Sequence, residues 1–204
     1  ILGHAELLLE DLDVNDVRRE DVRAIIEECR RCKRITGGLL GFARPTKTCF
    51  EKVDLCYLLN NAVSSLKPQH LFRKIAFDAL FPVTPIYVHG DADRLRQVLI
   101  NLLINAAQAM DGLGRMRLDL HVADGFAVLV IDDSGPGILE ADRDKVFEPF
   151  YSTKLPGEGT GLGLAVCRKL VVEHQGEIEL SDGELGGLQV RVRLPLEVGE
   201  GTLQ

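Results

Sequence analysis

The most informative segment of this sequence reads Gln97-Val98-Leu99-Ile100-Asn101-Leu102-Leu103-Ile104-Asn105-Ala106-Ala107-Gln108. Because an α-helix turns by about 100° per residue, its four amide side chains share an arc of about 80°, and apolar side chains cover the remaining surface. A helix that is apolar nearly all round is buried, and a buried amide without a partner costs about 1–3 kcal/mol. The segment therefore predicts a buried helix whose polar stripe meets something polar, for which a bound ligand or metal ion is the natural candidate.

Composition limits the classes of protein to consider. The chain has 204 residues, of which 46% are hydrophobic and 27% charged, as in an ordinary soluble protein with one sizeable domain and at most a small appendage. Its net charge of −7 argues against a nucleic-acid-binding surface. No apolar run approaches the roughly 18–20 residues that span a bilayer. The five scattered cysteines suit a reducing compartment. Cys29 and Cys32 are interpreted as packed helix residues rather than as a zinc or redox pair.

The N-terminal part predicts a helical hairpin. Residues 1–12 and about 18–43 show helical apolar periodicity, with a polar turn between them and Pro45 just after the second helix. Such a hairpin is too small to stand alone and must pack on another domain or on a second chain. The first helix has no capping residue before it, so we expect natural sequence upstream. Residues 46–52 are predicted to be a linker.

Beyond the linker, strands alternate with helices. Asp54 is predicted to cap a helix that continues to about Leu66, and Asp91 or Asp93 to cap the amide-bearing helix. A further helix is expected over Leu162–His174, and a long loop over about Ile138–Glu158. Strands are expected at Ile75–Leu80, Ile86–His89, Arg115–His121, Phe126–Asp132, Glu177–Leu180 and Gln189–Leu194. This order predicts an α+β fold, a two-layer α/β sandwich with a mixed, mostly antiparallel sheet.

Two glycine motifs have the chemistry of a nucleotide site. The strand that ends at Asp133 runs into Gly135 and Gly137, so a flat ligand can approach the backbone while the carboxylate accepts hydrogen bonds from an amino group such as that of adenine. Further on, Gly159, Gly161 and Gly163 stand directly before a helix, where backbone N–H groups can meet phosphate. In isolation the first motif is more often a simple turn, and the second serves equally well as a flexible hinge.

A third motif, Phe147-Glu148-Pro149-Phe150-Tyr151-Ser152-Thr153-Lys154, lies between them. Its two aromatics suit the anchors of a movable loop, and Lys154 suits contact with a terminal phosphate, although each residue alone is ordinary. The four motifs in this order resemble the ATP-binding catalytic domain of sensor histidine kinases, with its asparagine, first glycine, phenylalanine and second glycine boxes. The resemblance covers residues 53–198. Residues 1–45 resemble the end of the family's dimerisation and histidine phosphotransfer domain, and 199–204 form a tail.

The resemblance implies a role for each matching residue. Asn105 corresponds to the magnesium ligand and Asn101 to its support, and Lys154 completes the catalytic group by meeting the phosphates. Asp133 corresponds to the residue that binds the adenine amino group. Leu162 and Leu164 tie the second glycine segment to the core. The implied ATP and Mg²⁺ contacts come from Asn101, Asn105, Gln108, Asp133, Gly135, Gly137, Ile138, Phe147, Tyr151, Ser152, Thr153, Lys154, Gly159, Thr160, Gly161, Leu162, Gly163 and Leu164.

The same resemblance implies a reaction and partners. The γ-phosphate of ATP passes to a histidine and then to an aspartate of a response regulator receiver domain, in a cytoplasmic homodimer formed through the helical hairpin. None of the five histidines matches the acceptor position, and we expect them to be structural or surface residues and the acceptor to lie upstream. Any membrane attachment would also depend on upstream sequence. Two positions depart from the family pattern: Leu188 replaces a usual threonine, and Gln108 a usual lysine or arginine.

Two other functions remain as alternatives. The gyrase, mismatch-repair and heat-shock ATPases share the fold, but they place a glutamate general base four residues before the magnesium asparagine, where this chain has Asn101. An amide cannot take a proton from water, so the sequence predicts negligible steady-state ATP hydrolysis. The second alternative is a nucleotide-binding or interaction module without catalytic activity.

Overall fold

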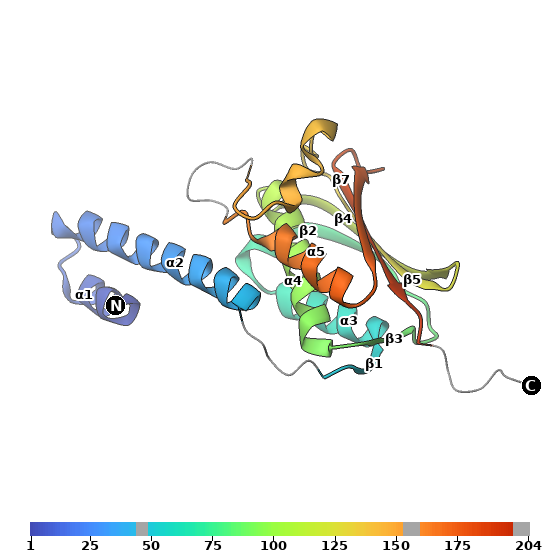
Figure 1. Cartoon of the computed structure of the whole chain (residues 1–204). Helices are drawn as coiled ribbons and strands as arrows, with labels where there is room; N and C mark the ends of the chain where they lie inside the picture. Colours follow the sequence, from blue (N-terminus) through green and yellow to red (C-terminus); the bar gives the residue numbers. More distant parts are fainter. Residues whose placement is uncertain (44–48, 153–159, 198–204) are drawn as a thin grey trace, which may run out of the picture.

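A computed structural model describes residues 1–43, 49–152 and 160–197 of the chain. A helical hairpin projects from one side of an α/β domain, in which three helices lie against one face of a twisted sheet (Figure 1). This is the α+β two-layer sandwich that the sequence predicts.

The hairpin consists of α1 (Leu2–Asp11) and α2 (Arg18–Ala43). Ala5, Val22 and Ile26 form its small buried core. Arg19 ties the two helices together, because its guanidinium donates to the Leu9 and Leu12 carbonyls at 2.9 and 2.6 Å, near the C-terminal end of α1. Those carbonyls have no partner within the helix, so the arginine acts as a cap from the neighbouring element.

The main sheet has five strands in the order β2-β4-β5-β7-β6, and β1 and β3 form a separate antiparallel pair. Only β2 and β4 run parallel within the main sheet, which confirms the mixed, mostly antiparallel prediction. The strands are β1 (Glu51–Asp54), β2 (Lys74–Leu80), β3 (Tyr87–Gly90), β4 (Leu113–Ala123), β5 (Phe126–Asp133), β6 (Glu177–Asp182) and β7 (Leu188–Pro195).

The helices that cover the sheet are α3 (Leu55–Leu66), α4 (Ala92–Ala109) and α5 (Gly163–Glu173). Asp54 caps α3 by accepting from the Tyr57 N–H at 3.1 Å. Of the two candidates for the α4 cap, Asp91 is correct: its carboxylate accepts from the N–H groups of Asp93 and Arg94, both at 3.1 Å, and Asp93 lies in the first turn. Each cap satisfies helix-terminal donors that would otherwise lack partners.

Two details differ from the sequence predictions. β1 includes Glu51 and Lys52, which the sequence places in the linker; the segment is a strand because it pairs with β3, a contact distant in sequence. The long loop expected over 138–158 contains two short 3₁₀ helices in its described part, η2 (Glu140–Asp142) and η3 (Lys145–Phe147). Short 3₁₀ segments leave little periodicity in a sequence.

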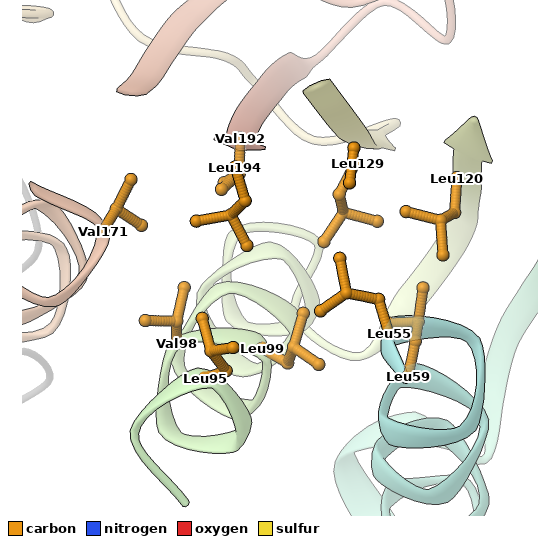
Figure 2. A pocket seen from close by; sticks show the side chains of 11 residues that line it. Leu55, Leu59, Leu95, Val98, Leu99, Leu120, Leu129, Val171, Val192 and Leu194 are labelled. Carbon is orange, nitrogen blue, oxygen red and sulfur yellow. The ribbon is translucent and has the colours of Figure 1, made fainter. Parts of the chain in front are cut away.

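A small cavity lies in the core between the helices and the sheet. Figure 2 shows its lining, in which leucine and valine side chains of α3 and α4 meet those of β4, β5 and β7. Its volume is about 20 Å³. A water molecule needs a similar space, roughly 10–15 Å³, but also two or more polar partners, and this lining is wholly apolar. The cavity is therefore a packing gap and not a ligand site.

The cavity predicts a stabilising substitution. Val192→Ile places one more methyl group beside the gap, and we expect it to raise the free energy of unfolding by up to about 1 kcal/mol. Val190 is buried on the same face of β7 but does not line the cavity. Val190→Ile should therefore overpack the core and lower stability by about 1–3 kcal/mol. Urea denaturation of both variants measures the difference, and equal effects would contradict the assignment of the gap.

Candidate functional site

The amide stripe of α4 lies under α5. Gln97, Asn101, Asn105 and Gln108 are all half-buried. The Asn101 side chain is hydrogen-bonded to the Cys167 thiol of α5, while burial raises the pKa of that thiol to about 12. The thiol also donates to the Val98 carbonyl at 3.8 Å. One amide of the stripe is therefore hydrogen-bonded within the protein, and the buried Cys167 holds Asn101 in place.

Asn105 lies against the first residue of α5. A Cβ atom at Gly163 would lie 3.3 Å from Asn105 Nδ2 and 3.6 Å from Oδ1, so glycine allows the two helices to approach at this point. The Leu162 N–H, just before the helix, donates to Thr160 Oγ1 at 3.4 Å. The first N–H groups of a helix have no partner inside it and favour an anion. The Asn105 amide and the N-terminus of α5 therefore lie next to each other.

Asp133 lies at the end of β5 and is 2% exposed. Its Oδ1 accepts from the Gly135 N–H at 2.8 Å and from the Leu188 N–H at 3.3 Å. Burial raises the pKa of this carboxyl, the charge of Asp132 raises it further, and the two N–H groups oppose the shift. The link through the Leu188 backbone does not depend on that residue's side chain, so the departure from threonine leaves it intact.

The turn between β6 and β7 closes over the two aspartates, a contact that the sequence does not reveal. Asp132 Oδ2 accepts from the Glu184 N–H at 3.1 Å. A Cβ atom at Gly187 would lie 2.4 Å from both the backbone oxygen and Oδ1 of Asp133. The only signal in the sequence is the density of glycines in Gly183-Glu184-Leu185-Gly186-Gly187, which indicates a turn but not its partner.

The neighbouring glycines of this turn allow a matched test. At Gly187 glycine is required by space, whereas Gly186 has open space around it and a φ of 92°. We expect Gly186→Ala to cost about 1 kcal/mol of stability through backbone strain. Gly187→Ala should cost about 2–3 kcal/mol, because the turn must move away from Asp133. Thermal unfolding measures both; a larger loss for Gly186→Ala would contradict the packing described here.

The described part of the long loop is anchored at its base. The Phe150 N–H donates to the Gly161 carbonyl at 3.0 Å, and Phe150 has a φ of 69°, unusual for a bulky residue. A Cβ atom at Gly161 would lie 2.4 Å from the Phe150 carbonyl carbon. The two ends of the loop are therefore held together by backbone contacts that exclude a side chain at Gly161.

Aromatic residues of the loop contact charged neighbours. The Tyr151 hydroxyl donates to Asp142 Oδ1 at 2.9 Å, and Lys145 Nζ donates to the same oxygen at 3.0 Å. These two bonds lower the pKa of the Asp142 carboxyl. The Arg168 guanidinium of α5 lies 5.1 Å from the Phe147 ring centre. Phe147 thus connects this loop to α5, and Tyr151 connects its later part to η2 within the same loop.

The predicted site residues come from four neighbouring parts of the chain. The C-terminal half of α4, the end of β5, the start of α5 and the loop base contribute Asn101, Asn105, Asp133, Gly163 and Gly161, and Gly135 follows β5 directly. Ile138, Gln108, Ser152, Thr160 and Leu164 belong to the same described segments, whereas Thr153, Lys154 and Gly159 lie outside the described residues.

Within the described part of the chain, no group of three His, Cys, Asp or Glu side chains is arranged to hold a metal ion. Over the same ranges, no helix combines the length and apolarity that crossing a membrane requires.

An amide-bearing helix, a buried aspartate and a glycine-flanked helix start lie on one α/β sandwich, a combination that points to the class of nucleotide-binding ATPase domains. Residues 90–198, more than half of the chain, match the family model described as histidine kinase-, DNA gyrase B-, and HSP90-like ATPase. The chain belongs to this family, and its relatives identify the domain as the ATP-binding catalytic domain of the sensor histidine kinase type.

Two curated relatives come from Escherichia coli K12. The sensor histidine kinase ZraS is 30% identical over 198 residues, which are 97% of this chain and 42% of ZraS. The signal transduction histidine-protein kinase AtoS is 27% identical over 96% of this chain and 32% of AtoS. The chain therefore spans less than half the length of these relatives.

Solved structures agree with this assignment. The mycobacterial sensor histidine kinase MprB is 31% identical to this chain, with a TM-score of 0.65. The match covers 73% of this chain and 99% of the MprB chain. Full-length ShkA in complex with AMPPNP is 27% identical with a TM-score of 0.75, over 100% of this chain and 44% of ShkA. The histidine kinase ThkA in complex with the response regulator protein TrrA is 25% identical with a TM-score of 0.75, over 96% of this chain and 57% of ThkA.

Proposed function

We propose that this chain is the catalytic part of a histidine protein kinase, which binds ATP with magnesium and transfers the γ-phosphate to a histidine for relay to a response regulator. The observation that carries this proposal is the close approach of Asn105 to Gly163. It places an amide oxygen, which can bind magnesium, beside the N-terminus of α5, which can bind phosphate. The solved ShkA complex contains AMPPNP, which supports an adenine nucleotide at this site.

The residues present suit a magnesium–nucleotide complex. Asn105 offers a hard oxygen ligand of the kind magnesium accepts, and magnesium commonly takes its remaining ligands from water and phosphate. When bound, the ion would neutralise charge on the phosphates. The protein's part is to orient the nucleotide: Asn101 is held by Cys167 beside Asn105 on α4, and the N–H groups at the start of α5 would meet the phosphates. Lys154 is proposed as a further phosphate contact.

At the other end of the site, Asp133 is proposed to accept a hydrogen bond from the adenine amino group. Its Oδ1 is already bonded to two backbone N–H groups, which leaves Oδ2 as the acceptor for the base. Gly135 has no side chain to obstruct the ring, and a Cβ atom there would lie 2.9 Å from Asp133 Oδ1. Positioning of this kind is the main contribution that a protein makes to phosphoryl transfer.

The helical hairpin is proposed to form a homodimer. Leu7, Leu8 and Ile25 remain 59%, 49% and 48% exposed although they lie on amphipathic helices. Pairing of two hairpins into a four-helix bundle would cover them. Light scattering should report a dimer, and a monomer at all concentrations would remove this part of the proposal. A cytoplasmic location and a response regulator partner belong to the same proposal; ThkA was solved with such a partner.

The deciding experiment supplies the acceptor separately. The chain is incubated with radiolabelled ATP, magnesium and the complete histidine domain of the cognate protein. We expect an acid-labile label on that domain and no label when its acceptor histidine is replaced. Steady-state hydrolysis of ATP to ADP and phosphate should stay negligible, because the amide of Asn101, which is hydrogen-bonded to Cys167, cannot act as a base toward water. Nucleotide binding without transfer would favour a passive module, and rapid hydrolysis would favour a gyrase-type ATPase.

A further inference from the structure

The buried side chain of His174 joins α4 and α5 at the end of this helix pair that lies opposite the contact of Asn105. His174 is the C-cap of α5 and is 4% exposed. Its Nε2 lies 3.0 Å from the backbone nitrogen of Asp91, the N-cap of α4, and its Nδ1 lies 2.7 Å from the Leu170 carbonyl oxygen. Because a backbone N–H can only donate, Nε2 is the acceptor and the ring proton is on Nδ1. We call the bond between Asp91 and His174 the helix joint.

The contacts between α4 and α5 follow one another in antiparallel order along both helices. The helix joint is followed by the bond from the Cys167 thiol to the Val98 carbonyl. Gly163 and Asn105 then meet at the opposite end of the pair. At 1.5 Å per residue, α4 rises by about 21 Å between its N-cap and Asn105. The helix joint and the proposed phosphate site therefore mark the two ends of one helix pair.

The helix joint supplies direction that the apolar contacts lack. The buried side chains of α4 and α5 are almost all apolar, and the hydrophobic effect has no preferred direction. Packed helices can shift along each other by roughly 1–2 Å, whereas a hydrogen bond depends on both distance and angle. The helix joint, with an ion pair between Arg94 and Glu173 beside it, therefore fixes the axial position of α5 on α4. That position decides where Gly163 lies relative to Asn105.

The linker reaches the helix joint from outside. The Phe50 ring centre lies 4.9 Å from that of His174. The Cys49 N–H donates to Asp91 Oδ2 at 3.3 Å, while the other carboxylate oxygen caps α4. From β3, a Cβ atom at Gly90 would lie 2.6 Å from His174 Cδ2, so the ring leaves no room for a side chain there. The first described residues after the hairpin therefore close over the helix joint.

We propose that His174 is a positioning residue of the nucleotide site, because it holds α5 in register on α4 and so keeps the first turn of α5 against Asn105. Phe50 shields the helix joint from water, and with Cys49 it connects the linker to the register of the two helices. A displacement of the linker therefore reaches the phosphate end of the site. The effect on nucleotide rests on the proposed function, whereas the register itself does not.

Two amide variants of the whole chain separate the bond between the helices from the bond within α5. In His174→Gln the side-chain oxygen can take the position of Nε2 and accept from the Asp91 N–H. In His174→Asn the amide nitrogen can take the position of Nδ1, but the Asp91 N–H loses its acceptor. We expect His174→Gln to bind ADP with magnesium within about threefold of the wild type, and His174→Asn about tenfold more weakly. Calorimetric titration measures both, and equal affinities in the two variants would overturn the proposal.

The register can also be measured without nucleotide. A Cβ atom at Gly163 would lie 3.3 Å from Asn105 Nδ2, close enough for a nuclear Overhauser effect between the Gly163 α protons and the Asn105 side-chain amide. This effect should persist in His174→Gln and weaken in His174→Asn, although the substitution lies about 20 Å away along the helix pair. Its full persistence in His174→Asn would overturn the proposal. Its loss there, in a chain whose wild type binds no ADP, would support the register and overturn the proposed function alone.

Val63→Ala controls for a general loss of stability. Val63 is buried on α3, outside the helix joint. The variant should lower the melting temperature, as His174→Asn does, because it leaves a cavity in the core. It should leave both the ADP affinity and the Overhauser effect as in the wild type. A parallel loss of affinity in Val63→Ala would assign the effect of His174→Asn to destabilisation and overturn the proposal.

Phe50→Ala tests the connection to the linker. It should weaken ADP binding by about threefold and shift the Gly163 amide resonance. Tyr87→Ala is the matched control, because Tyr87 is 37% exposed, as Phe50 is, and its ring centre lies 4.2 Å from Lys52 Nζ. The control should change neither readout. Equal effects in both variants, or none in Phe50→Ala, would overturn the connection. Since Phe50 is partly exposed, its variant also tests the helix joint should His174→Asn fail to fold.

Discussion

Asn105→Asp is expected to lower the affinity of this chain for magnesium–ATP by about a hundredfold or more, equivalent to about 2.7 kcal/mol. The substitution keeps the shape of the side chain, so its contact with Gly163 and the packing of α4 on α5 are preserved. It places a negative charge beside the proposed phosphate position, where a half-buried location weakens solvent screening. The loss therefore arises from charge at the site and not from altered packing.

The measurement is calorimetric titration of the wild type and the variant with ATP and with ADP, each with magnesium. The loss should be larger for ATP, which brings the additional phosphate nearest the new charge. Asn60→Asp is the matched control, because Asn60 is an exposed amide on α3, where it donates to the Cys56 carbonyl at 2.9 Å. That variant should bind as the wild type does. An unchanged affinity in Asn105→Asp would place the triphosphate elsewhere and remove the basis of the kinase proposal.

The elements that carry this site could be predicted from sequence because their signals are local. The amide stripe on α4, the cap at Asp91 and the strand ending at Asp133 each depend on residues within a few positions of one another. Helical periodicity and capping are patterns of residues close together in sequence, so they can be recognised without the structure. The same holds for the start of α5, where closely spaced glycines directly precede the helix.

The contacts that complete the site depend on residues distant in sequence, and no local pattern encodes them. Cys167 fixes Asn101 from another helix, and the Gly187 turn closes on Asp133 from across the sheet. β1 becomes a strand only through its pairing with β3.

Asp133→Asn is expected to weaken nucleotide binding without weakening the fold. In the variant, the amide oxygen must accept from the Gly135 and Leu188 N–H groups, as Oδ1 does in the wild type. The amide NH₂ then faces the ligand, where it meets the adenine amino group as a second donor. We expect ADP affinity to fall by about thirty- to a hundredfold, or roughly 2–3 kcal/mol for the lost bond to a charged acceptor. IDP, which presents a carbonyl at the same position of the base, should lose little, so the preference for ADP over IDP should disappear.

The same substitution should stabilise the fold at neutral pH. Burial and the neighbouring Asp132 raise the pKa of the Asp133 carboxyl in the folded state. A raised folded pKa means that this group's contribution to stability is complete below its unfolded pKa, near 3.9, and is lost as the pH rises through the folded value. Asparagine does not titrate, so the variant should melt above the wild type at pH 7.5, and the gap should narrow as the pH falls toward about 4.

Asp132→Asn provides the control for the binding readout. Asp132 is also buried, at 1% exposed, but its two carboxylate oxygens accept from the β6–β7 turn, at the N–H groups of Glu184 and Leu185, at 3.1 and 3.5 Å. An asparagine there can keep only one of these two bonds, but neither of them involves the proposed base site, so ADP affinity should stay within about threefold of the wild type. Loss of the ADP preference in Asp132→Asn, or its retention in Asp133→Asn, would mean that the base does not meet Asp133. A variant at Asp133 that binds less nucleotide yet melts at a higher temperature would show that this carboxylate is retained for the ligand at a cost to the fold.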